Sequence, residues 1–305
     1  WFAQKKPDVV ILEVGIGGLY DSTNVIVPAV SGIVTVGYDH MHVLGDTLAE
    51  IACQKAGIIK PNVPVVIGRL PQAARQTIIA DAQEKQAPLY ENGRQFTAKK
   101  INRHQLKNEI VYDGLMLHRQ RFQLGLAGEY QVDNAAVALT MAQLYLKRLG
   151  VPIDVQAFQN GLANTRWPGR LEIVNDSPLV VLDGAHNLPG MQALTTTLQN
   201  DFKEMEIYVL VAILADKQYQ LMLGEIASLP NVHLMLTNFA GPGPKRPSAD
   251  LKKAAADIKT HWPIETASSW QEGLLRLSRE VSADDAILIT GSLYFISEVR
   301  RFFAD

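Results

Sequence analysis

The sequence predicts an α/β protein of two domains, the second of which is a doubly wound domain. Its 305 residues exceed what one ordinary core needs and suit two domains of about 100 to 200 residues each. Short apolar runs alternate with helical patterns along the carboxyl-terminal half, and Pro168-Gly169 interrupts regular structure before that half begins. We therefore expect domains over residues 1–165 and 171–305, joined by a linker at 166–170.

Composition and charge narrow the classes of partner. Lys and Arg number 29 against 31 Asp and Glu, so the net charge of −2 predicts neither nucleic acid nor an anionic membrane as a partner. No apolar run approaches the roughly 18 residues that a membrane-spanning helix needs. The single cysteine, Cys53, excludes an internal disulfide framework and favours a reducing compartment, so we expect a cytoplasmic protein.

The first predicted strand covers Val9–Leu12, whose continuous apolar character is typical of a parallel strand buried on both faces. Glu13 stands at its carboxyl end and is either paired with a nearby cation or a functional carboxylate. The following Gly15-Ile-Gly17-Gly18 is similar to a dinucleotide-binding fingerprint, but Tyr20 occupies the place of the third glycine. The segment after it is too short for a crossover helix, so we disfavour an oxidoreductase.

A second predicted strand over Ser31–Tyr38 is followed by Asp39-His40. Ligands of an open parallel sheet bind outside the carboxyl ends of its strands, so Glu13 and His40 are predicted to be neighbours in one site. A lone histidine is more often structural than a ligand, whereas its place at a strand end beside an acid favours a function. Both interpretations of His40 stay open.

Thr47 and Glu50 have the spacing of a capping box and predict the start of a helix that runs to about Ile59. Lys55 falls on the apolar stripe of this helix, together with Leu48. Because an unpaired ammonium is costly to bury, Lys55 must pair with carboxylates, extend to solvent or lose its proton. A neutral amine could form a carbamate with carbon dioxide, which would offer oxygen ligands to a metal.

The rest of the first domain contains a short strand, a small β-rich insert and three helices. We expect the strand at 64–68, the insert at about 88–128 with extended stretches at 109–114 and 115–118, and the helices at 72–85, 133–149 and 158–163. The charges of the insert are expected to form a solvated face.

The second domain shows strands and helices in regular alternation. Strands are predicted at 179–182, 207–213, 232–236, 264–266 and 286–290, and helices at 190–200, 218–227, 249–258, 269–278 and 294–303. The strand ends carry Asp183-Gly-Ala-His186-Asn187, Asp216-Lys217 and Gly291-Ser292, so polar groups are predicted to gather at one edge of the sheet. Gly291-Ser292 precedes a helix and could bind a carboxylate or phosphate.

The linker carries Arg170, which could meet a phosphate or form an interdomain salt bridge. The sequence has no nucleophile elbow and no pair of cysteines suited to zinc. Strand-end acids, histidines and a linker arginine therefore indicate metal-assisted chemistry on phosphate, with magnesium as the metal that oxygen ligands prefer.

Several segments together resemble a known family. They are Leu12–Gly18, Asp21–Asn24, Tyr38–His40, Leu44–Thr47, Lys55–Lys60, Pro168–Arg170 and Asp183–Asn187. In this order they resemble the motifs of the folylpolyglutamate synthase and dihydrofolate synthase family, which belongs to the Mur ligase superfamily. The resemblance implies a partial P-loop-type Mur ligase central domain followed by a Rossmann-like carboxyl-terminal domain.

The resemblance also implies an activity. Such an enzyme is an ATP-dependent amide ligase that joins L-glutamate to a folate or dihydropteroate carboxylate through an acyl phosphate. ATP and Mg²⁺ are the implied cofactors, the partners are these small molecules, and the family expectation is a monomer. By position, the implied metal ligands are Glu13, His40 and a carbamylated Lys55; the ATP contacts are Asn134, Arg170 and, at the ribose, Asp183; the residues around the incoming glutamate are His186 and Ser292. Lys55 and His186 are the implied catalytic residues.

The sequence departs from the family pattern at several positions. Leu19 stands in place of an arginine, Leu188 displaces a proline to position 189, and Tyr130 stands where a histidine is usual. No Gly-x-x-x-x-Gly-Lys-Ser/Thr phosphate loop occurs, whereas the family carries one upstream of the Glu13 position. We therefore expect a preceding segment to be missing, and this chain alone to bind nucleotide weakly without ligase turnover.

Two alternatives stay open. One is a Mur ligase of the peptidoglycan-building type, and the other is a non-catalytic nucleotide- or folate-binding protein. The presence of Glu13, His40, Lys55 and Arg170 argues against the second, because a protein that had lost catalysis would be expected to lose such costly residues as well. The sequence does not separate dihydrofolate synthase from folylpolyglutamate synthase activity.

Overall fold

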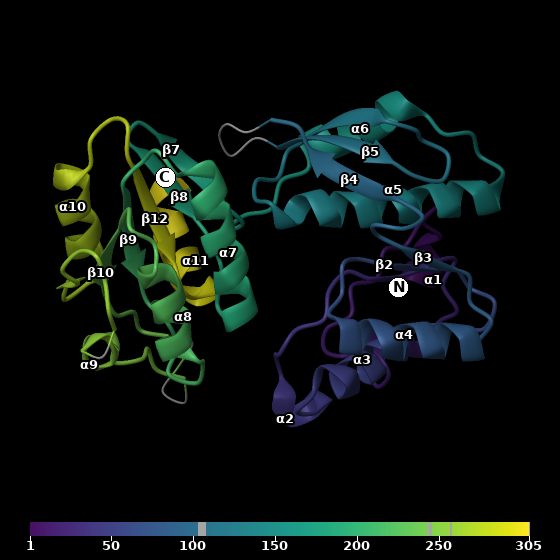
Figure 1. The fold of residues 1–305 in the computed structure, drawn as a ribbon, viewed down its shortest axis with the longest axis horizontal. Helices are drawn as coiled ribbons and strands as arrows, with labels where there is room; N and C mark the ends of the chain where they lie inside the picture. Colours follow the sequence, from purple (N-terminus) through teal and green to yellow (C-terminus); the bar gives the residue numbers. More distant parts are fainter. Residues whose placement is uncertain (103–107, 242, 244–245, 257, 305) are drawn as a thin grey trace. The chain divides into compact units, whose positions relative to one another are not determined.

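The computed structural model describes residues 1–102, 108–241, 243, 246–256 and 258–304 of the chain. Contacts divide the chain into two compact units, which Figure 1 shows as ribbons. The amino-terminal unit comprises Trp1–Thr97, Asp113–His118 and Ala136–Ile153. The carboxyl-terminal unit comprises Ala98–Tyr112, Arg119–Ala135 and Asp154–Asp305.

The amino-terminal unit is built on a parallel sheet in the order β1-β2-β3, formed by β1 (Ser31–Ile33), β2 (Val65–Ile67) and β3 (Leu89–Glu91). Two helices, α3 (Leu48–Ala56) and α4 (Gln72–Glu84), pack against a common core with β1 and β2. Three short helical elements, α1 (Phe2–Lys5), the 3₁₀ helix η1 (Ser22–Val25) and α2 (Met41–Leu44), lie in the segments that precede α3.

The capping box predicted at the start of α3 is confirmed. The Thr47 Oγ1 accepts the backbone N–H of Glu50 at 3.2 Å, and the Glu50 Oε2 accepts the backbone N–H of Thr47 at 3.0 Å. Each bond satisfies a donor that the first turn of a helix otherwise leaves without a partner. These two side chains therefore fix where α3, the helix that carries Lys55, begins.

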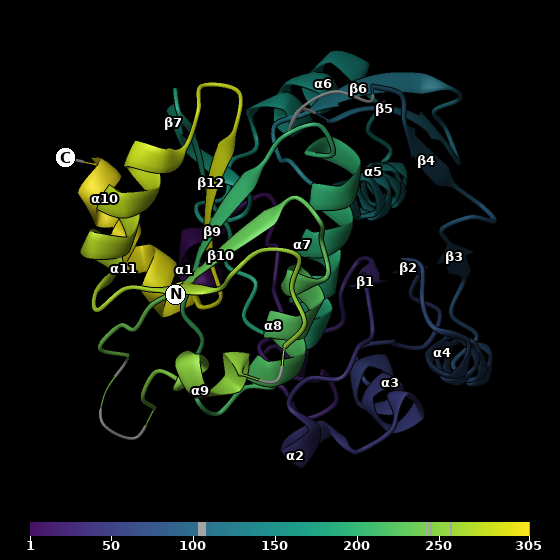
Figure 2. The same cartoon turned by 60° about the vertical axis from the view of Figure 1, so that its left-hand side comes forward.

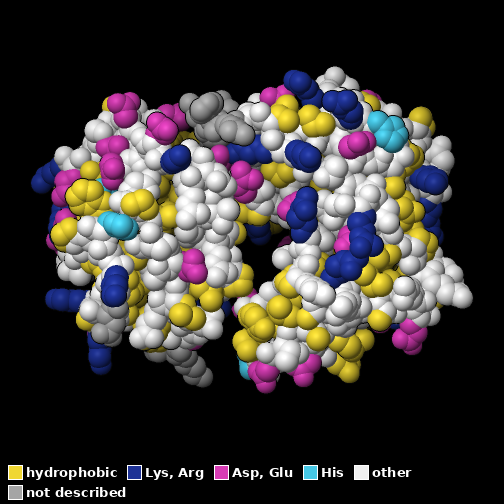
Figure 3. Space-filling view, viewed as in Figure 1, with side chains coloured by type: hydrophobic (Ala, Val, Ile, Leu, Met, Phe, Trp, Pro, Cys, Tyr) yellow, Lys and Arg dark blue, Asp and Glu magenta, His cyan; other side chains and the backbone are white. Residues whose placement is uncertain are grey.

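The strand predicted over Val9–Leu12 is wrong, because this segment forms no strand and is exposed. The side chain of Ile11 is 91% exposed, and Val9, Val10 and Leu12 are also on the surface. A strand exists only through hydrogen bonds to a neighbour, and within the described residues this segment pairs with neither edge of the β1-β2-β3 sheet. Figure 3, which shows one face of the molecule, has hydrophobic side chains on the surface of the amino-terminal unit.

The second predicted strand is shorter than expected. Only Ser31–Ile33 of the predicted Ser31–Tyr38 pairs with a neighbour, and the last bond between the two strands runs from the Gly68 N–H to the Ile33 carbonyl at 3.0 Å. Gly68 then lies against the backbone of Val34, where a Cβ would be 2.0 Å from the carbonyl oxygen. The chain therefore reaches Asp39-His40 in an extended segment without sheet pairing.

The insert predicted at about 88–128 contains a sheet in the order β4-β5-β6. Its strands are β4 (Thr97–Lys100), β5 (Asn108–Asp113) and β6 (Gln120–Leu124), and β5 pairs with β6 in antiparallel register. The predicted extended stretch at 115–118 is instead part of the turn between β5 and β6. Two helices follow, the long α5 (Tyr130–Leu149) and α6 (Val155–Asn164), which contacts β6.

The carboxyl-terminal unit contains a six-stranded sheet in the order β11-β10-β9-β12-β8-β7. All neighbouring pairs are parallel except β7–β8, which is antiparallel. The strands are β7 (Glu172–Asp176), β8 (Leu179–Leu182), β9 (Ile207–Val211), β10 (Val232–Leu236), β11 (Glu265–Thr266) and β12 (Ala286–Thr290). The predictions for β8, β10 and β12 match residue for residue.

Helices cover both faces of this sheet, as Figure 2 shows, so the doubly wound prediction is confirmed. On one face lie α7 (Leu188–Asp201), α8 (Tyr219–Ala227) and α9 (Leu251–Ala255), and on the other lie α10 (Trp270–Glu280) and α11 (Leu293–Ala304). The helix after β8 and the helix after β12 therefore leave toward opposite faces. At such a switch point the carboxyl ends of neighbouring strands form a crevice that suits a ligand.

Among the helices of the described residues, none has the length and apolar character needed to cross a membrane.

Replacing Thr47 with Ala is expected to lower the free energy of unfolding of the amino-terminal unit by about 1 kcal/mol, because the N-cap acceptor of α3 is lost. Hydrogen exchange of the α3 amides along a urea series measures this change. Thr77→Ala is the matched control, since Thr77 lies within α4 and, among the described residues, its hydroxyl donates only back to the carbonyl of Ala73. An equal loss in both variants would contradict the capping role.

Candidate functional site

Asp183 is a buried carboxylate that directly follows β8. The residue is 5% exposed, and its two oxygens accept the backbone N–H groups of Leu171 at 3.0 Å and Ala185 at 2.9 Å. Burial raises the pKa of Asp183 to about 6, although these two bonds and the charge of Arg170 oppose the shift. The carboxyl group is thus fixed in orientation and can change its charge not far below neutral pH.

Arg170 lies in the linker, within electrostatic range of Asp183. Its guanidinium carbon is 5.5 Å from the centre of the Trp167 ring, a cation–π distance. The backbone N–H of Gly184 donates to the carbonyl of Gly169 at 2.7 Å, which ties the linker to the loop after β8. An exposed guanidinium is therefore held at the carboxyl end of the strand, where an anion could reach it.

Tyr130, the first residue of α5, also belongs to this cluster. Burial and then the charge of Asp183 raise the pKa of its hydroxyl, whereas Arg170 lowers it, so the phenol lies within electrostatic range of both. Gly128 packs against the ring: a Cβ there would be 2.8 Å from the Tyr130 Cε1. The sequence marked Tyr130 only as a departure from the family pattern, and no local signal indicates its neighbours.

Asn134 stands one turn after Tyr130 and so lies on the same face of α5. Its Nδ2 donates to the Oε1 of Gln131 at 2.9 Å, which orients the amide. The structure thus assembles Asp183, Arg170 and the first turn of α5 from three separate segments of the chain. We call these residues, with Tyr130 and Asn134, the strand-end cluster.

His186 and Ser292, predicted around the incoming glutamate, follow β8 and β12, which are neighbours in the sheet. The Nδ1 of His186 is 2.9 Å from the carbonyl oxygen of Gly184, an orientation in which the ring can donate that bond. Ser292 is 1% exposed, and its hydroxyl has no hydrogen-bond partner in the described structure. A buried hydroxyl without a partner is costly, and a ligand could supply the missing bond.

A second group of polar side chains forms around Asp216, in the loop that follows β9. Arg246 donates from Nε to the Oδ2 of Asp216 at 2.8 Å, and its guanidinium carbon is 5.8 Å from the ring centre of Tyr294 on α11. The sequence singled out Asp216, but its partners Arg246 and Tyr294 were missed because nothing local relates residues so far apart. The group adds charge at the edge of the sheet that holds Ser292.

In the amino-terminal unit, His40 is the N-cap of α2 rather than the end of a strand. It adopts a left-handed backbone conformation with φ 51°, and its Nε2 is 4.0 Å from the Oδ1 of Asp39. Its side chain is 41% exposed. The side chain is therefore open to a ligand on one side and close to a carboxylate on the other.

Lys55 lies in the last turn of α3 and is half-buried. Burial lowers the pKa of its amine, while the negative charge of Asp39 raises it. The structure thus supports the expectation that the charge of Lys55 is costly where it lies. Asp39 is the acid whose negative charge offsets part of this cost. Asp39 also links Lys55 to His40 electrostatically.

The glycine-rich loop after Glu13 is anchored on the end of α3. Asp21 accepts the backbone N–H groups of Gly15 and Ile16 at 3.0 and 3.1 Å, and the hydroxyl and N–H of Thr23. These bonds, led by the Thr23 hydroxyl, lower the pKa of Asp21 to about 2. Gly18 comes so close to α3 that a Cβ would lie 3.0 Å from the Lys55 carbonyl oxygen.

Glu13 itself is exposed and makes no hydrogen bond or ion pair with any residue that the structure describes. Among the described residues, no three His, Cys, Asp or Glu side chains are grouped so that they could hold a metal ion. A carbamylated lysine would add oxygen ligands beyond this set. The metal site of Glu13, His40 and Lys55 stays a prediction.

Comparison with known proteins gives the family. The model of the Mur ligase middle domain matches residues 2–142, and that of the Mur ligase glutamate ligase domain matches residues 169–293. The chain is 38% identical over 302 residues to the folylpolyglutamate synthase of Lacticaseibacillus casei, covering 99% of this chain and 68% of that protein. This chain belongs to the folylpolyglutamate synthase family of Mur ligases.

One further curated relative and two solved structures agree. The dihydrofolate synthase/folylpolyglutamate synthase of Bacillus subtilis is 33% identical over 321 residues, covering 99% of this chain and 69% of that protein. Among solved structures, the apo form of the L. casei synthase superimposes with a TM-score of 0.81 at 34% identity, over 100% of this chain and 68% of that one. The Mycobacterium tuberculosis synthase complexed with ADP and AMPPCP gives 0.84 at 28% identity, over 100% and 70%.

Leu19, where this chain departs from the family pattern, has a structural role. The backbone N–H of Leu19 donates to the carbonyl of Gln54 at 2.7 Å, and a Cβ at Gly57 would lie 2.3 Å from the Leu19 Cα. The amide of Asn24 reaches the carbonyls of both Leu19 and Gly57 at 3.1 Å. The glycine-rich loop of the family is therefore closed here by backbone contacts around Leu19.

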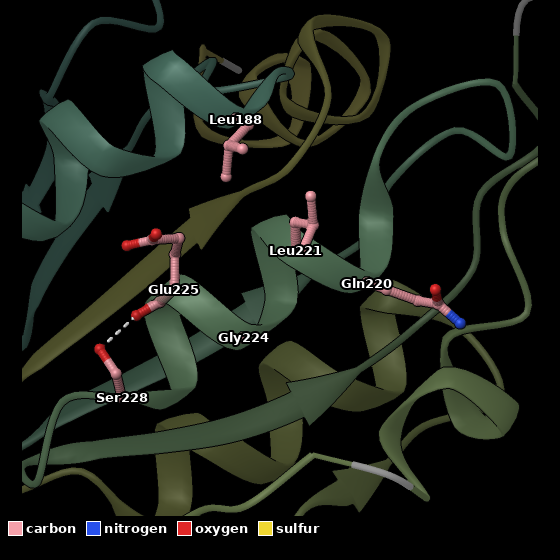
Figure 4. Close-up of a pocket in the computed structure, with 6 residues that line it drawn as sticks. All are labelled: Leu188, Gln220, Leu221, Gly224, Glu225 and Ser228. Carbon is pink, nitrogen blue, oxygen red and sulfur yellow. Dashed lines mark hydrogen bonds between the residues drawn. The ribbon is translucent and has the colours of Figure 1, made fainter.

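A shallow groove lies between α7 and α8, as Figure 4 shows. Its volume is about 330 Å³, and its lining residues are Leu188, Gln220, Leu221, Gly224, Glu225 and Ser228. The Ser228 hydroxyl donates to the carbonyl of Glu225 at 2.6 Å. None of the predicted site residues lines this groove.

The raised pKa of Asp183 predicts a pH dependence of stability. Between about pH 4 and about pH 6 the folded state holds its proton more tightly than the unfolded state, so stability falls as pH rises through this window, by up to roughly 3 kcal/mol. The difference between the unfolding free energies of the wild type and Asp183→Asn measures it. Parallel curves for the two proteins would show that Asp183 is not protonated in the folded state.

Proposed function

We propose that this protein is an ATP-dependent amide ligase that joins L-glutamate to the carboxylate of a folate. The observation that carries the proposal is the strand-end cluster at a switch point of the sheet. There the fixed carboxylate of Asp183 and the exposed guanidinium of Arg170 lie within electrostatic range of Tyr130, one turn before the oriented amide of Asn134. Family membership supports it, and one solved relative is a complex with AMPPCP and folate, with a TM-score of 0.78.

Three members of the strand-end cluster each suit one part of a nucleotide. Asp183 presents a carboxylate whose orientation is set by two backbone bonds, and such a group accepts bonds from ribose hydroxyls. Arg170 offers a forked cation for phosphate oxygens. Asn134, oriented by Gln131, lies on the same face of α5 as Tyr130 and supplies an amide for the base or sugar.

The chemistry consists of two transfers. The terminal phosphoryl group of ATP passes to a carboxylate oxygen of the folate, which gives an acyl phosphate and ADP. The amino group of glutamate then attacks the acyl carbon, the amide bond forms, and phosphate leaves with the carbon–oxygen bond electrons while the amine loses a proton. We assign His186 and the Ser292 hydroxyl to the glutamate.

Magnesium is the metal that oxygen ligands at an ATP site suit, and it would neutralise charge on the phosphates. Glu13, His40 and Lys55 would hold it, with Lys55 as a carbamate formed when its amine adds carbon dioxide and loses a proton. The half-buried position of Lys55 supports this assignment, because burial lowers the pKa of its amine and so favours the neutral form that can add carbon dioxide. The negative charge of Asp39 opposes that shift. Glu13 would have to be recruited from its exposed loop.

The proposal extends to substrate and location. The relatives that match across the chain are named folylpolyglutamate synthases, so a peptidoglycan-type substrate is not favoured. Dihydropteroate is a second acceptor to consider, because the B. subtilis relative is named a dihydrofolate synthase as well. The single cysteine, which is exposed, fits the reducing cytoplasm. A monomer is the expectation that comes with the family.

A substrate screen tests the function. The full-length protein that carries this sequence is incubated with ATP, labelled L-glutamate and one acceptor: a folate, dihydropteroate or a UDP-linked muramyl peptide. ATP-dependent incorporation of glutamate is expected with folate and not with the UDP-linked peptide, because the relatives that match across the chain are named folylpolyglutamate synthases. Incorporation into the peptide alone would contradict the proposal.

Lys55→Ala should lose most of the ligase activity of the full-length protein, and short carboxylic acids should restore part of it by replacing the carbamate oxygens. The measurement is initial rate against acetate concentration. Lys60→Ala is the control, since within the described part of the chain the Lys60 amine hydrogen-bonds only to the Gly57 carbonyl, at 3.4 Å. A normal rate in Lys55→Ala would leave Lys55 a structural residue.

A further inference from the structure

Asp201 is an acid placed at the unfavourable end of a helix. It is the last residue of α7, where unpaired carbonyl groups already create negative potential. Its side chain is only 2% exposed, so solvent does not offset that repulsion. A buried carboxylate in this position needs a cation close by.

Lys100 supplies that cation from β4. Its Nζ is 2.5 Å from the Oδ1 of Asp201 and 3.9 Å from the Oε1 of Glu129, and its side chain is 10% exposed. The other oxygen of Asp201 has no hydrogen-bond partner in the described structure. Lys100 is therefore what compensates Asp201, and it reaches Glu129 at the same time.

Glu129 is the residue immediately before α5, and the chain around it is held by two further side chains. The Nδ2 of Asn108, a fully buried residue on β5, donates to the carbonyls of Leu126 at 3.1 Å and Gly128 at 2.8 Å. The backbone N–H of Glu129 donates to the Oγ1 of Thr197 at 3.4 Å. The lead-in to α5 is thus fixed on one side by the small sheet and on the other by α7.

Thr197 and Asp201 are one turn apart on α7 and so share one face of the helix. That face meets Glu129 and Lys100, while the opposite end of α7 begins directly after Asp183–Asn187, with Asn187 as its N-cap. The same helix therefore connects the Asp183 end of the strand-end cluster with the start of α5, which carries Tyr130 and Asn134.

We propose that Lys100 is a positioning residue for nucleotide binding: through Asp201 and Glu129 it holds the first turn of α5, with Asn134, in register with Asp183 and Arg170. The proposal rests on the assignment of the strand-end cluster to the nucleotide. Removing the charge of Lys100 leaves Asp201 without compensation and also breaks the link from α7 to Glu129, so α7 and the lead-in to α5 separate. A small displacement of one half of a binding site is enough to weaken it strongly.

The test uses three variants of the full-length protein that carries this sequence, and two measurements. Lys100→Met removes the cation, Lys100→Arg keeps it, and Lys99→Met is the matched control, because Lys99 is the exposed neighbour on the same strand. The measurements are hydrogen exchange of the amides of residues 130–134 and the Kd for a fluorescent ADP analogue. We expect Lys100→Met to raise both by about 10-fold, and the other two to stay within about twofold of the wild type.

A fourth variant separates positioning from stability. Replacing both members, Lys100→Met with Asp201→Leu, removes the buried charges together, and such neutral pairs commonly retain the melting temperature. We expect the wild-type melting temperature, with exchange at 130–134 and the Kd still raised because the link to Glu129 is gone. Wild-type exchange and Kd in this double variant would overturn the proposal.

The outcomes for the two proposals differ. If the wild type binds no ADP analogue while the exchange at 130–134 rises as expected, the nucleotide assignment of the cluster fails and the positioning of Asn134 for nucleotide is overturned with it. If the wild type binds the analogue and Lys100→Met binds it equally well with unchanged exchange, only the role of Lys100 is overturned.

Discussion

The carboxylate of Asp183 is the interaction on which the carboxyl-terminal unit depends. One oxygen accepts the N–H of Leu171 at the end of the linker, and the other accepts the N–H of Ala185 in the loop that leads to α7. Both bonds are buried, so a missing partner would leave a polar group unsatisfied at high cost. The linker, β8 and α7 are therefore fixed to one another, and Arg170 is brought to the same point.

This arrangement explains why the candidate site is polar yet ordered. Gly128 packs close to both Tyr130 and Leu171, and the amino end of α7 is capped by Asn187. Hydrogen bonds from buried groups fix directions as well as distances, whereas apolar packing alone fixes chiefly volume. A nucleotide that binds here would meet groups oriented beforehand, which lowers the cost of ordering them on binding.

The sequence predicted most of the second domain, because strands buried on both faces are continuous apolar runs; β8, β10 and β12 are examples. It failed at Val9–Leu12, which is just as apolar, because pairing depends on a neighbour that local sequence does not reveal. Asp183 and Arg170 followed from motifs, and Tyr130 did not, because its neighbours belong to distant segments. The Lys100–Asp201 pair likewise has no signature in either segment.

A crystal structure of the full-length protein that carries this sequence, with bound ADP, tests the account most directly. The account predicts ribose hydroxyls within hydrogen-bond distance of the Asp183 carboxylate, phosphate oxygens beside the Arg170 guanidinium, and the Asn134 amide in contact with the nucleoside. ADP bound elsewhere, for example in the groove between α7 and α8, with the strand-end cluster free of it, would contradict the account.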